Sequence, residues 1–221
     1  MKLFGTAILA LAAVKADDDQ SSGVDGKKLQ QTSEMLAHIL PGSKKDGKQI
    51  IFRHGCYCFS RPGGLVGPRN GYHGAPLDEL DALCRDLYRS QKCLPADIDD
   101  CTPDQAYPYT LNADESVTCG PDPVTAPKWA SREANACKLK TCQLELEFAE
   151  AVNALVDSGY VADPNFSYIR DADYDAFCPS VATGIPPPEL ECCGEGIKRK
   201  PFNGVTNECC PSGIIATPGS C

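Results

Sequence analysis

Apolar residues recur at helical spacing in three segments of the chain, and each segment predicts a helix. The first covers residues 29–40 and ends at Pro41-Gly42. The second begins after Pro76, where acidic residues near its start suit the helix dipole. The third, residues 129–158, is the longest, and Gly159 ends it. One face of the second helix carries Leu77, Leu80, Cys84, Leu87 and Gln91. The chain is therefore expected to be mainly α-helical.

The segments around these helices are rich in Gly, Pro, Ser and Asp. Residues 17–28 contain a single apolar side chain and are expected to form an acidic flexible leader. Residues 59–74 predict an irregular loop, and residues 94–128 form a Pro- and Asp-rich excursion. Residues 160–177 carry aromatic side chains among aspartates, so we expect them to wrap around the helical body.

The N-terminus has the layout of a secretory signal peptide. Lys2 precedes an apolar run from Leu3 to Ala13, and small residues stand before the acidic run that starts at Asp17. Residues 1–16 are therefore predicted to be removed, with cleavage near Ala16. No later stretch approaches the ~18 apolar residues that a membrane span needs, so the protein is expected to be secreted and soluble.

The chain has 14 cysteines, an even number. In an exported protein they indicate disulfides rather than zinc ligands, because the secretory route is oxidising. Six of them lie in residues 178–221. This density predicts a small, separately stapled C-terminal module.

The charge balance is acidic. Without Lys2 and Lys15, 19 basic residues face 30 acidic ones, which lowers the formal charge from -9 to -11. Such a surface repels nucleic acid and anionic lipid and favours cations. Calcium or a mineral surface is therefore an expected partner, and nucleic acid is not.

A cysteine motif and the start of the second helix resemble the centre of the secreted phospholipase A2 enzymes. The chain reads Gly55-Cys56-Tyr57-Cys58, then Pro76-Leu77-Asp78-Glu79-Leu80-Asp81, then Cys84-Arg85-Asp86-Leu87-Tyr88. Enzymes of this family have a G-C-Y-C-G-x-G-G calcium loop, followed on a helix by P-x-D-x-x-D-x-C-C-x-x-H-D. The resemblance covers residues 29–177, with its specific motifs within residues 55–87. It implies a core of two long antiparallel helices plus an N-terminal helix.

The same resemblance implies that the catalytic residues are missing. In the family, the His of the helix motif activates water and the next Asp holds calcium, but the matching positions here are Leu87 and Tyr88. If Cys84 instead matches the first cysteine of the family's pair, the positions fall on Tyr88 and Arg89, which cannot do this chemistry either. The family's third element is an acid that orients the His, and the matching residue is Gln143.

Backbone carbonyls of the family's loop hold calcium, and the matching positions are Tyr57, Phe59 and Arg61. We treat them as candidate calcium ligands, although Phe59 and Arg61 replace glycines and a strong site also needs anionic oxygen. The resemblance further implies a disulfide between Cys58 and Cys84.

Two further motifs lie towards the C-terminus. The pairs Cys192-Cys193 and Cys209-Cys210 resemble the di-cysteine repeats of galaxin-like proteins, which are secreted into extracellular and mineralised matrices. A small disulfide knot with no role beyond stability is an equally weighted alternative. Asn165 begins the only N-glycosylation sequon, and we expect it to carry a glycan in an exported chain.

Three classes of function stay open. The replaced catalytic positions favour an inactive phospholipase A2-like binding or structural protein of the extracellular space, with an acidic or mineralised matrix as one setting. Its expected partners are calcium or a mineral surface, phospholipid, or another protein. The second class is a divergent calcium-dependent phospholipase A2 that cleaves the sn-2 ester of phospholipids with His73 or His54 as the base. The third is a toxin-type or inhibitor subunit.

Overall fold

A computed structural model describes residues 24–40, 53–61, 64–68, 72–121, 133–163, 165–167, 169, 173–179 and 191–221. The predicted signal peptide, residues 1–16, and residues 17–23 of the predicted leader lie outside the described residues. None of the described helices is both long and apolar enough to cross a bilayer.

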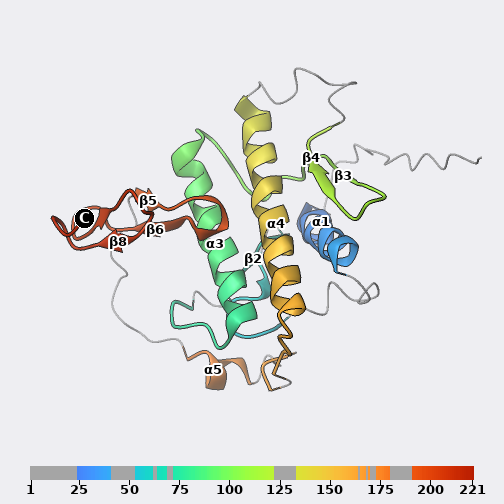
Figure 1. Cartoon of the computed structure of the whole chain (residues 1–221), viewed down its shortest axis with the longest axis horizontal. Helices are drawn as coiled ribbons and strands as arrows, with labels where there is room; N and C mark the ends of the chain where they lie inside the picture. Colours follow the sequence, from blue (N-terminus) through green and yellow to red (C-terminus); the bar gives the residue numbers. More distant parts are fainter. Residues whose placement is uncertain are drawn as a thin grey trace, which may run out of the picture.

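Three long helices form the body of the protein (Figure 1). They are α1 (Val24–Ile39), α3 (Glu79–Asp97) and α4 (Glu133–Asp157), and a short helix, α5 (Tyr174–Phe177), lies at one end. Helices α3 and α4 lie side by side and run in opposite directions, and α1 packs against α4. The helix-rich, disulfide-rich fold expected from the sequence is confirmed at this level.

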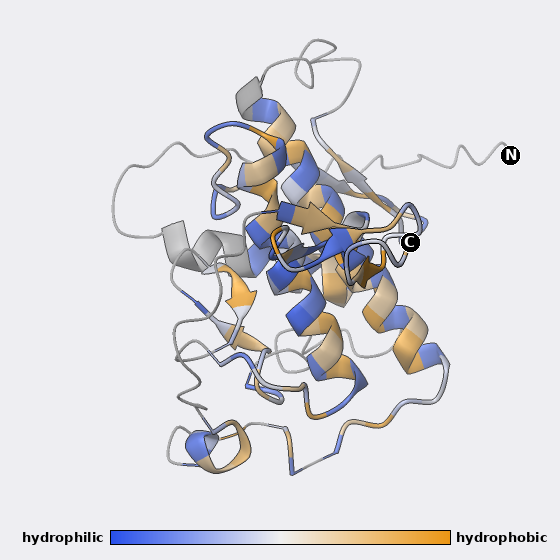
Figure 2. Cartoon of the chain, turned by 90° about the vertical axis from the view of Figure 1, so that its left-hand side faces the viewer, coloured by the Kyte–Doolittle hydropathy of each residue, from blue (hydrophilic) through white to orange (hydrophobic). Residues whose placement is uncertain are grey.

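The core lies between these helices because each of them is amphipathic. In Figure 2 the helices carry blue and orange bands in turn, as expected when polar and apolar residues alternate around the axis. Buried apolar side chains at helical spacing line the contact, and they are Leu80, Leu87 and Leu94 of α3, Leu144, Phe148 and Val152 of α4, and Met35 and Leu36 of α1. Burial of each such side chain contributes roughly 1.5–3 kcal/mol.

Helix α3 begins as the sequence predicts. Asp78 is its N-cap, and the Asp78 carboxylate accepts a hydrogen bond from the Asp81 N–H at 2.9 Å. The helix continues through Pro95 to Asp97, because a proline near the end of a helix interrupts few backbone bonds.

The other helix boundaries differ from the prediction. Helix α1 begins at Val24, so residues 24–28 belong to the helix and the predicted leader was wrong there. Lys27 and Lys28 are good helix formers, and a helix nucleated by its packed apolar turns extends into them. Helix α4 ends one residue before the predicted end, and residues 129–132 lie outside the described residues.

Four two-stranded antiparallel sheets complete the described structure. The strand pairs are β1 (Phe59–Ser60) with β2 (Val66–Gly67), β3 (Tyr109–Leu111) with β4 (Val117–Cys119), β5 (Glu191–Cys193) with β6 (Lys200–Phe202), and β7 (Glu208–Cys209) with β8 (Ile215–Ala216). The first two pairs lie in the segments predicted as an irregular loop and an excursion. These strands are too short to show an alternating pattern in the sequence.

All 14 cysteines are paired. The seven disulfides are Cys56–Cys178, Cys58–Cys84, Cys93–Cys192, Cys101–Cys137, Cys119–Cys142, Cys193–Cys209 and Cys210–Cys221. The Cys58–Cys84 bridge implied by the resemblance is present.

The C-terminal residues are not a separately stapled module, which corrects the prediction. Two of their six cysteines, Cys178 and Cys192, bond to Cys56 and Cys93 of the body. Strand β6 and the 3-10 turn Gly196–Lys198 also contact α3. Cysteine spacing cannot distinguish pairing within a module from pairing between modules.

Candidate functional site

The candidate site lies where the resemblance places a catalytic centre, between α3 and the segment around Cys56. Leu87, which the resemblance matches to the family's catalytic His, is fully buried in the core. A leucine neither accepts a proton nor orients water. The Gln143 side chain, at the position of the orienting acid, is exposed, and the neighbouring Cys142 is bonded to Cys119. These positions therefore carry no acid–base chemistry.

Tyr88, at the position of the calcium-binding Asp, is packed between basic side chains. The Arg61 guanidinium lies 5.0 Å from the centroid of the Tyr88 ring, and the Lys92 ammonium lies 5.2 Å from it. Both are cation–π distances. A Cβ on Gly67 would lie 2.8 Å from the Tyr88 ring, so the backbone of β2 also packs against it. The ring fills the space between α3 and the β1–β2 hairpin.

The backbone around two of the candidate calcium ligands, Phe59 and Arg61, forms a β-hairpin rather than a glycine-rich calcium loop. Phe59 lies in β1 opposite Gly67, and the carbonyl of Arg61 accepts a hydrogen bond from the Gly64 N–H at 3.0 Å. Within the described part of the chain, no three His, Cys, Asp or Glu side chains are grouped as metal ligands. Arg61 adds a positive charge beside Tyr88, where a calcium site would need anionic oxygen. The Arg61 charge therefore disfavours a Ca²⁺ ion beside Tyr88, and the assignment of the Tyr57, Phe59 and Arg61 carbonyls as calcium ligands stays a prediction.

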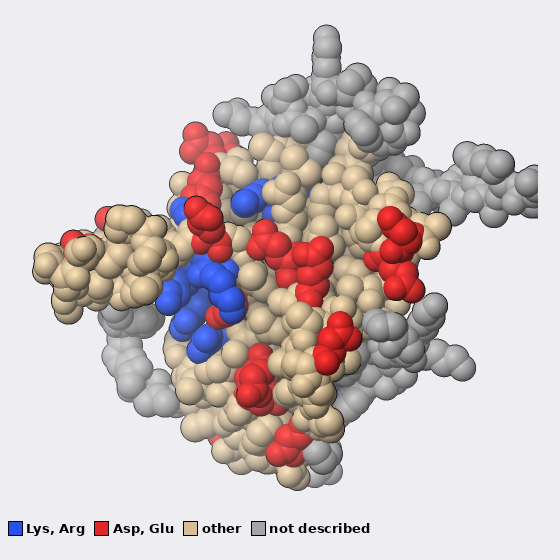
Figure 3. Space-filling view, in the orientation of Figure 1, with Lys and Arg blue, Asp and Glu red and all other residues tan. Residues whose placement is uncertain are grey.

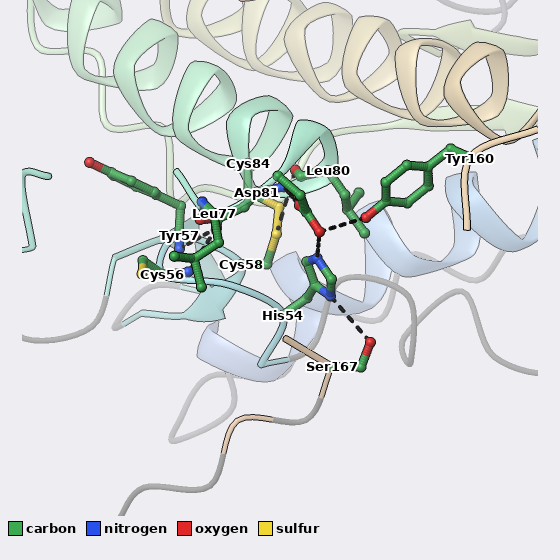
Figure 4. The surroundings of a disulfide bond; sticks show 11 residues. His54, Cys56, Tyr57, Cys58, Leu77, Leu80, Asp81, Cys84, Tyr160 and Ser167 are labelled. Atoms are coloured by element: carbon green, nitrogen blue, oxygen red, sulfur yellow. Dashed lines mark hydrogen bonds and ion pairs between the residues drawn. A yellow bond between two sulfur atoms is a disulfide. The ribbon is translucent and has the colours of Figure 1, made fainter. Parts of the chain in front are cut away.

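Asp81 holds the Cys56 turn onto the start of α3 (Figure 4). Its side chain is fully buried, and Oδ1 accepts hydrogen bonds from the backbone N–H groups of Cys56 at 2.9 Å and Tyr57 at 2.7 Å. Oδ2 accepts a third from the Leu77 N–H at 2.9 Å. Burial raises the pKa of Asp81 although these three bonds oppose the shift. The carboxylate therefore fixes the turn and is shielded from solvent.

A second polar network surrounds His54. This imidazole is buried, and its Nε2 lies 2.7 Å from Oδ2 of Asp78, the residue that caps α3. The Tyr160 hydroxyl donates to the same oxygen at 2.7 Å, and the Ser167 hydroxyl lies 3.4 Å from His54 Nδ1 (Figure 4). Burial acts to raise the pKa of Asp78, but the hydrogen bonds from His54, the Asp81 N–H and Tyr160 outweigh it and lower the pKa. The network joins three segments of the chain, around His54, around Asp78 and from Tyr160 to Ser167.

The other proposed base, His73, is exposed on its loop and takes no part in this network. Asn165 is exposed, and its backbone N–H donates to Asp163 Oδ1 at 2.8 Å. The structure thus brings His54 to the start of α3 and leaves His73 and Asn165 at the surface.

Sequence reasoning missed a third buried network around Glu145 of α4. Thr32 of α1 donates to Glu145 Oε2 at 2.7 Å, and Gln91 of α3 donates to Oε1 at 3.2 Å. The Tyr107 hydroxyl also donates to Oε2, and burial followed by the Glu145 charge raises the pKa of Tyr107. The only signal in the sequence is an acidic residue on the otherwise apolar stripe of the longest helix.

No protein-family model matches this chain, and no curated protein matches it significantly. The resemblance to secreted phospholipase A2 therefore rests on the order of residues between Gly55 and Leu87, together with the helix order and the cysteine placement.

Proposed function

We propose that this chain is a secreted, non-catalytic binding or structural protein with a phospholipase A2-like architecture. The observation that carries the proposal is the environment of Tyr88, whose ring packs against Arg61 and the backbone of Gly67. A metal ion and a water nucleophile both need that space. The neighbouring Leu87 is buried and cannot act as a base.

The size of the expected catalytic loss supports the same conclusion. A general base typically contributes about 10²–10⁴ in rate, and loss of the group that orients it lowers the rate further. Leu87 and Gln143 stand at both of these positions. The expected rate of lipolysis is therefore lower than that of an active family member by about 10⁴ or more.

The features that match the family are the structural ones. The Cys58–Cys84 bridge and the Asp81 carboxylate both fasten the Cys56 turn to α3. The Asp78 cap starts that helix. A chain that retains these structural residues but has replaced the catalytic ones fits a role in binding.

Extracellular function is supported by the disulfides and by the signal-like N-terminus. Seven disulfides are stable only in an oxidising compartment. The net charge of -9 favours contact with calcium or a mineral surface over attack on an anionic bilayer. An acidic or mineralised extracellular matrix is the setting that fits both features.

Phospholipid hydrolysis by the purified, oxidised chain tests the proposal. The substrate is mixed phospholipid micelles with millimolar calcium, with a chelator as the control and an active secreted phospholipase A2 as the positive reference. Circular dichroism and an intact mass lacking free thiols establish that the protein is folded. We expect no turnover above the blank, and chelator-sensitive turnover would overturn the proposal.

One observation favours the second candidate, a divergent phospholipase A2. The His54–Asp78 contact of 2.7 Å is the geometry of a base with its orienting acid. If His54 is a base, His54→Gln abolishes turnover while the folded fraction is unchanged, and His73→Ala serves as the matched exposed control. Equal turnover in wild type and His54→Gln would reject His54 as the base.

A further inference from the structure

Basic side chains gather on one face of this acidic protein. In Figure 3 a blue cluster lies over α3, beside the projecting C-terminal residues 191–221, which we call the C-terminal module, whereas red side chains are scattered over the rest of the visible face. The contacts described below assign five residues to this basic stripe: Arg61, Arg85, Arg89, Lys92 and Lys198.

Helix geometry arranges three of these residues in a line. Arg85, Arg89 and Lys92 follow one another at spacings of four and three, so they lie on the same face of α3. At 1.5 Å per residue they extend over about 10 Å along the helix axis. The basic stripe is therefore elongated.

Neighbouring elements add one basic side chain on each side of this line. Arg61, from the end of β1, reaches the Tyr88 ring that also contacts Lys92. Lys198, from the C-terminal module, binds Asp86 at 3.0 Å, and the same carboxylate contacts Arg85 at 3.3 Å. The Cys93–Cys192 disulfide fixes the module beside α3. The stripe is thus assembled from three parts of the chain.

The arginines of the stripe have unused capacity for hydrogen bonding. Within the described part of the chain, neither Arg61 nor Arg89 forms an ion pair with a carboxylate. Asp86 pairs with Arg85 and Lys198 of the stripe. Guanidinium groups bind oxyanions such as sulfate in a bidentate manner. Because like charges repel, a bound anion stabilises this arrangement.

The shape and surface of the stripe select among anionic partners. The exposed large apolar side chains of the described residues are Leu111, Val156, Val161, Phe177, Val205 and Ile214, and none lies on α3. Insertion into a lipid surface is therefore not favoured here. Tyr88 is only 8% exposed and is covered by Arg61 and Lys92, so it offers no platform for stacking nucleic-acid bases. A flexible chain that carries anions at regular intervals fits a line of cations.

We propose that the basic stripe binds a linear sulfated polysaccharide. This partner deepens the proposed function, because it names a ligand for the binding protein, but it does not depend on the absence of lipolysis. Binding is electrostatic, so it weakens as the salt concentration rises.

The test measures the affinity of the full oxidised chain for heparin oligosaccharides by calorimetry at 150 mM salt, with desulfated heparin as the ligand control. Arg89→Glu reverses one charge at a residue without a carboxylate partner, and we expect it to weaken binding about tenfold. Lys138→Glu makes the same charge change on α4, at a residue outside the stripe as defined, and we expect a change of less than about twofold. Circular dichroism confirms that both variants fold.

Several outcomes overturn the proposal. These are no heparin binding by the wild-type chain, equal weakening by Arg89→Glu and Lys138→Glu, or equal affinity for desulfated heparin. Tighter binding to DNA of equal charge, or to phosphatidylserine vesicles, would assign the stripe to those partners instead. If the protein hydrolyses phospholipid in the micelle assay and still binds heparin, the proposal that it is non-catalytic is wrong but the proposed polysaccharide site is retained.

Discussion

Replacement of Asp81 by alanine is the most direct perturbation of the scaffold. The carboxylate is fully buried and accepts three backbone hydrogen bonds, of 2.9, 2.7 and 2.9 Å, from Cys56, Tyr57 and Leu77. Asp81→Ala leaves these three N–H groups without an acceptor. Asp81→Asn keeps one oxygen but turns an amide NH₂ towards one of the donors.

The magnitude follows from the number of orphaned donors. Each buried, unsatisfied N–H destabilises a protein by about 1–3 kcal/mol. Burial of the charged carboxylate itself destabilises the fold, as the raised pKa of Asp81 indicates, and this offsets part of the stabilisation from its three hydrogen bonds. We therefore use the lower end of the range, about 1 kcal/mol for each donor. We expect Asp81→Ala to lower the free energy of unfolding by about 3 kcal/mol and Asp81→Asn by about 1–2 kcal/mol.

Urea unfolding with the disulfides intact measures these differences from the shift in midpoint at constant slope. Asp97→Ala is the matched control, because its 2.5 Å pair with Arg199 is at the surface and contributes less than about 1 kcal/mol. An Asp81→Ala variant within about 1 kcal/mol of wild type would refute the reasoning. So would an asparagine variant as unstable as the alanine variant.

Three further predictions concern the same scaffold. Gly55 has φ of 59°, and a Cβ there would lie 2.2 Å from Asp81 Cγ, so we expect Gly55→Ala to destabilise the fold by more than about 2 kcal/mol in urea. The lowered pKa of Asp78 stabilises the fold at neutral pH, and this contribution is lost as pH falls through the folded-state pKa, below about pH 4. The stability gap between wild type and Asp78→Asn should therefore narrow between about pH 6 and pH 3, and a constant gap in a pH series of urea curves would contradict this. Joint replacement of Cys93 and Cys192 by alanine should lower the free energy of unfolding by about 2–4 kcal/mol and raise the rate of hydrogen exchange in the C-terminal module. An unchanged exchange rate would show that the other contacts are sufficient to hold the module on α3.

Local signals in the sequence predicted the local parts of the structure. Apolar spacing placed the three long helices, and Asp78 was recognisable near the start of α3 because acidic residues favour a helix N-terminus. The start of α1 was missed, because propensity alone does not define where a packed helix begins to fray.

The parts that depend on distant contacts were not predictable in the same way. His54 and Asp78 lie 24 residues apart, and Thr32 and Glu145 lie 113 apart, so no spacing rule links them. No signal in the sequence links Cys93 to Cys192, since this pairing requires the C-terminal module to dock on α3. The place of Arg61 on Tyr88 likewise arises only when the β1–β2 hairpin folds over the helix.

Because of the Cys93–Cys192 bridge, the C-terminal module cannot be deleted without leaving an unpaired cysteine in the body. A chain shortened after Cys178 keeps its Cys56 partner but leaves Cys93 as an odd thiol. In an oxidising compartment such a thiol forms bonds between molecules, which leads to dimers and aggregates. Deletion in the laboratory, or loss in evolution, must therefore change Cys93 at the same step, so the body and the module are inherited as one unit.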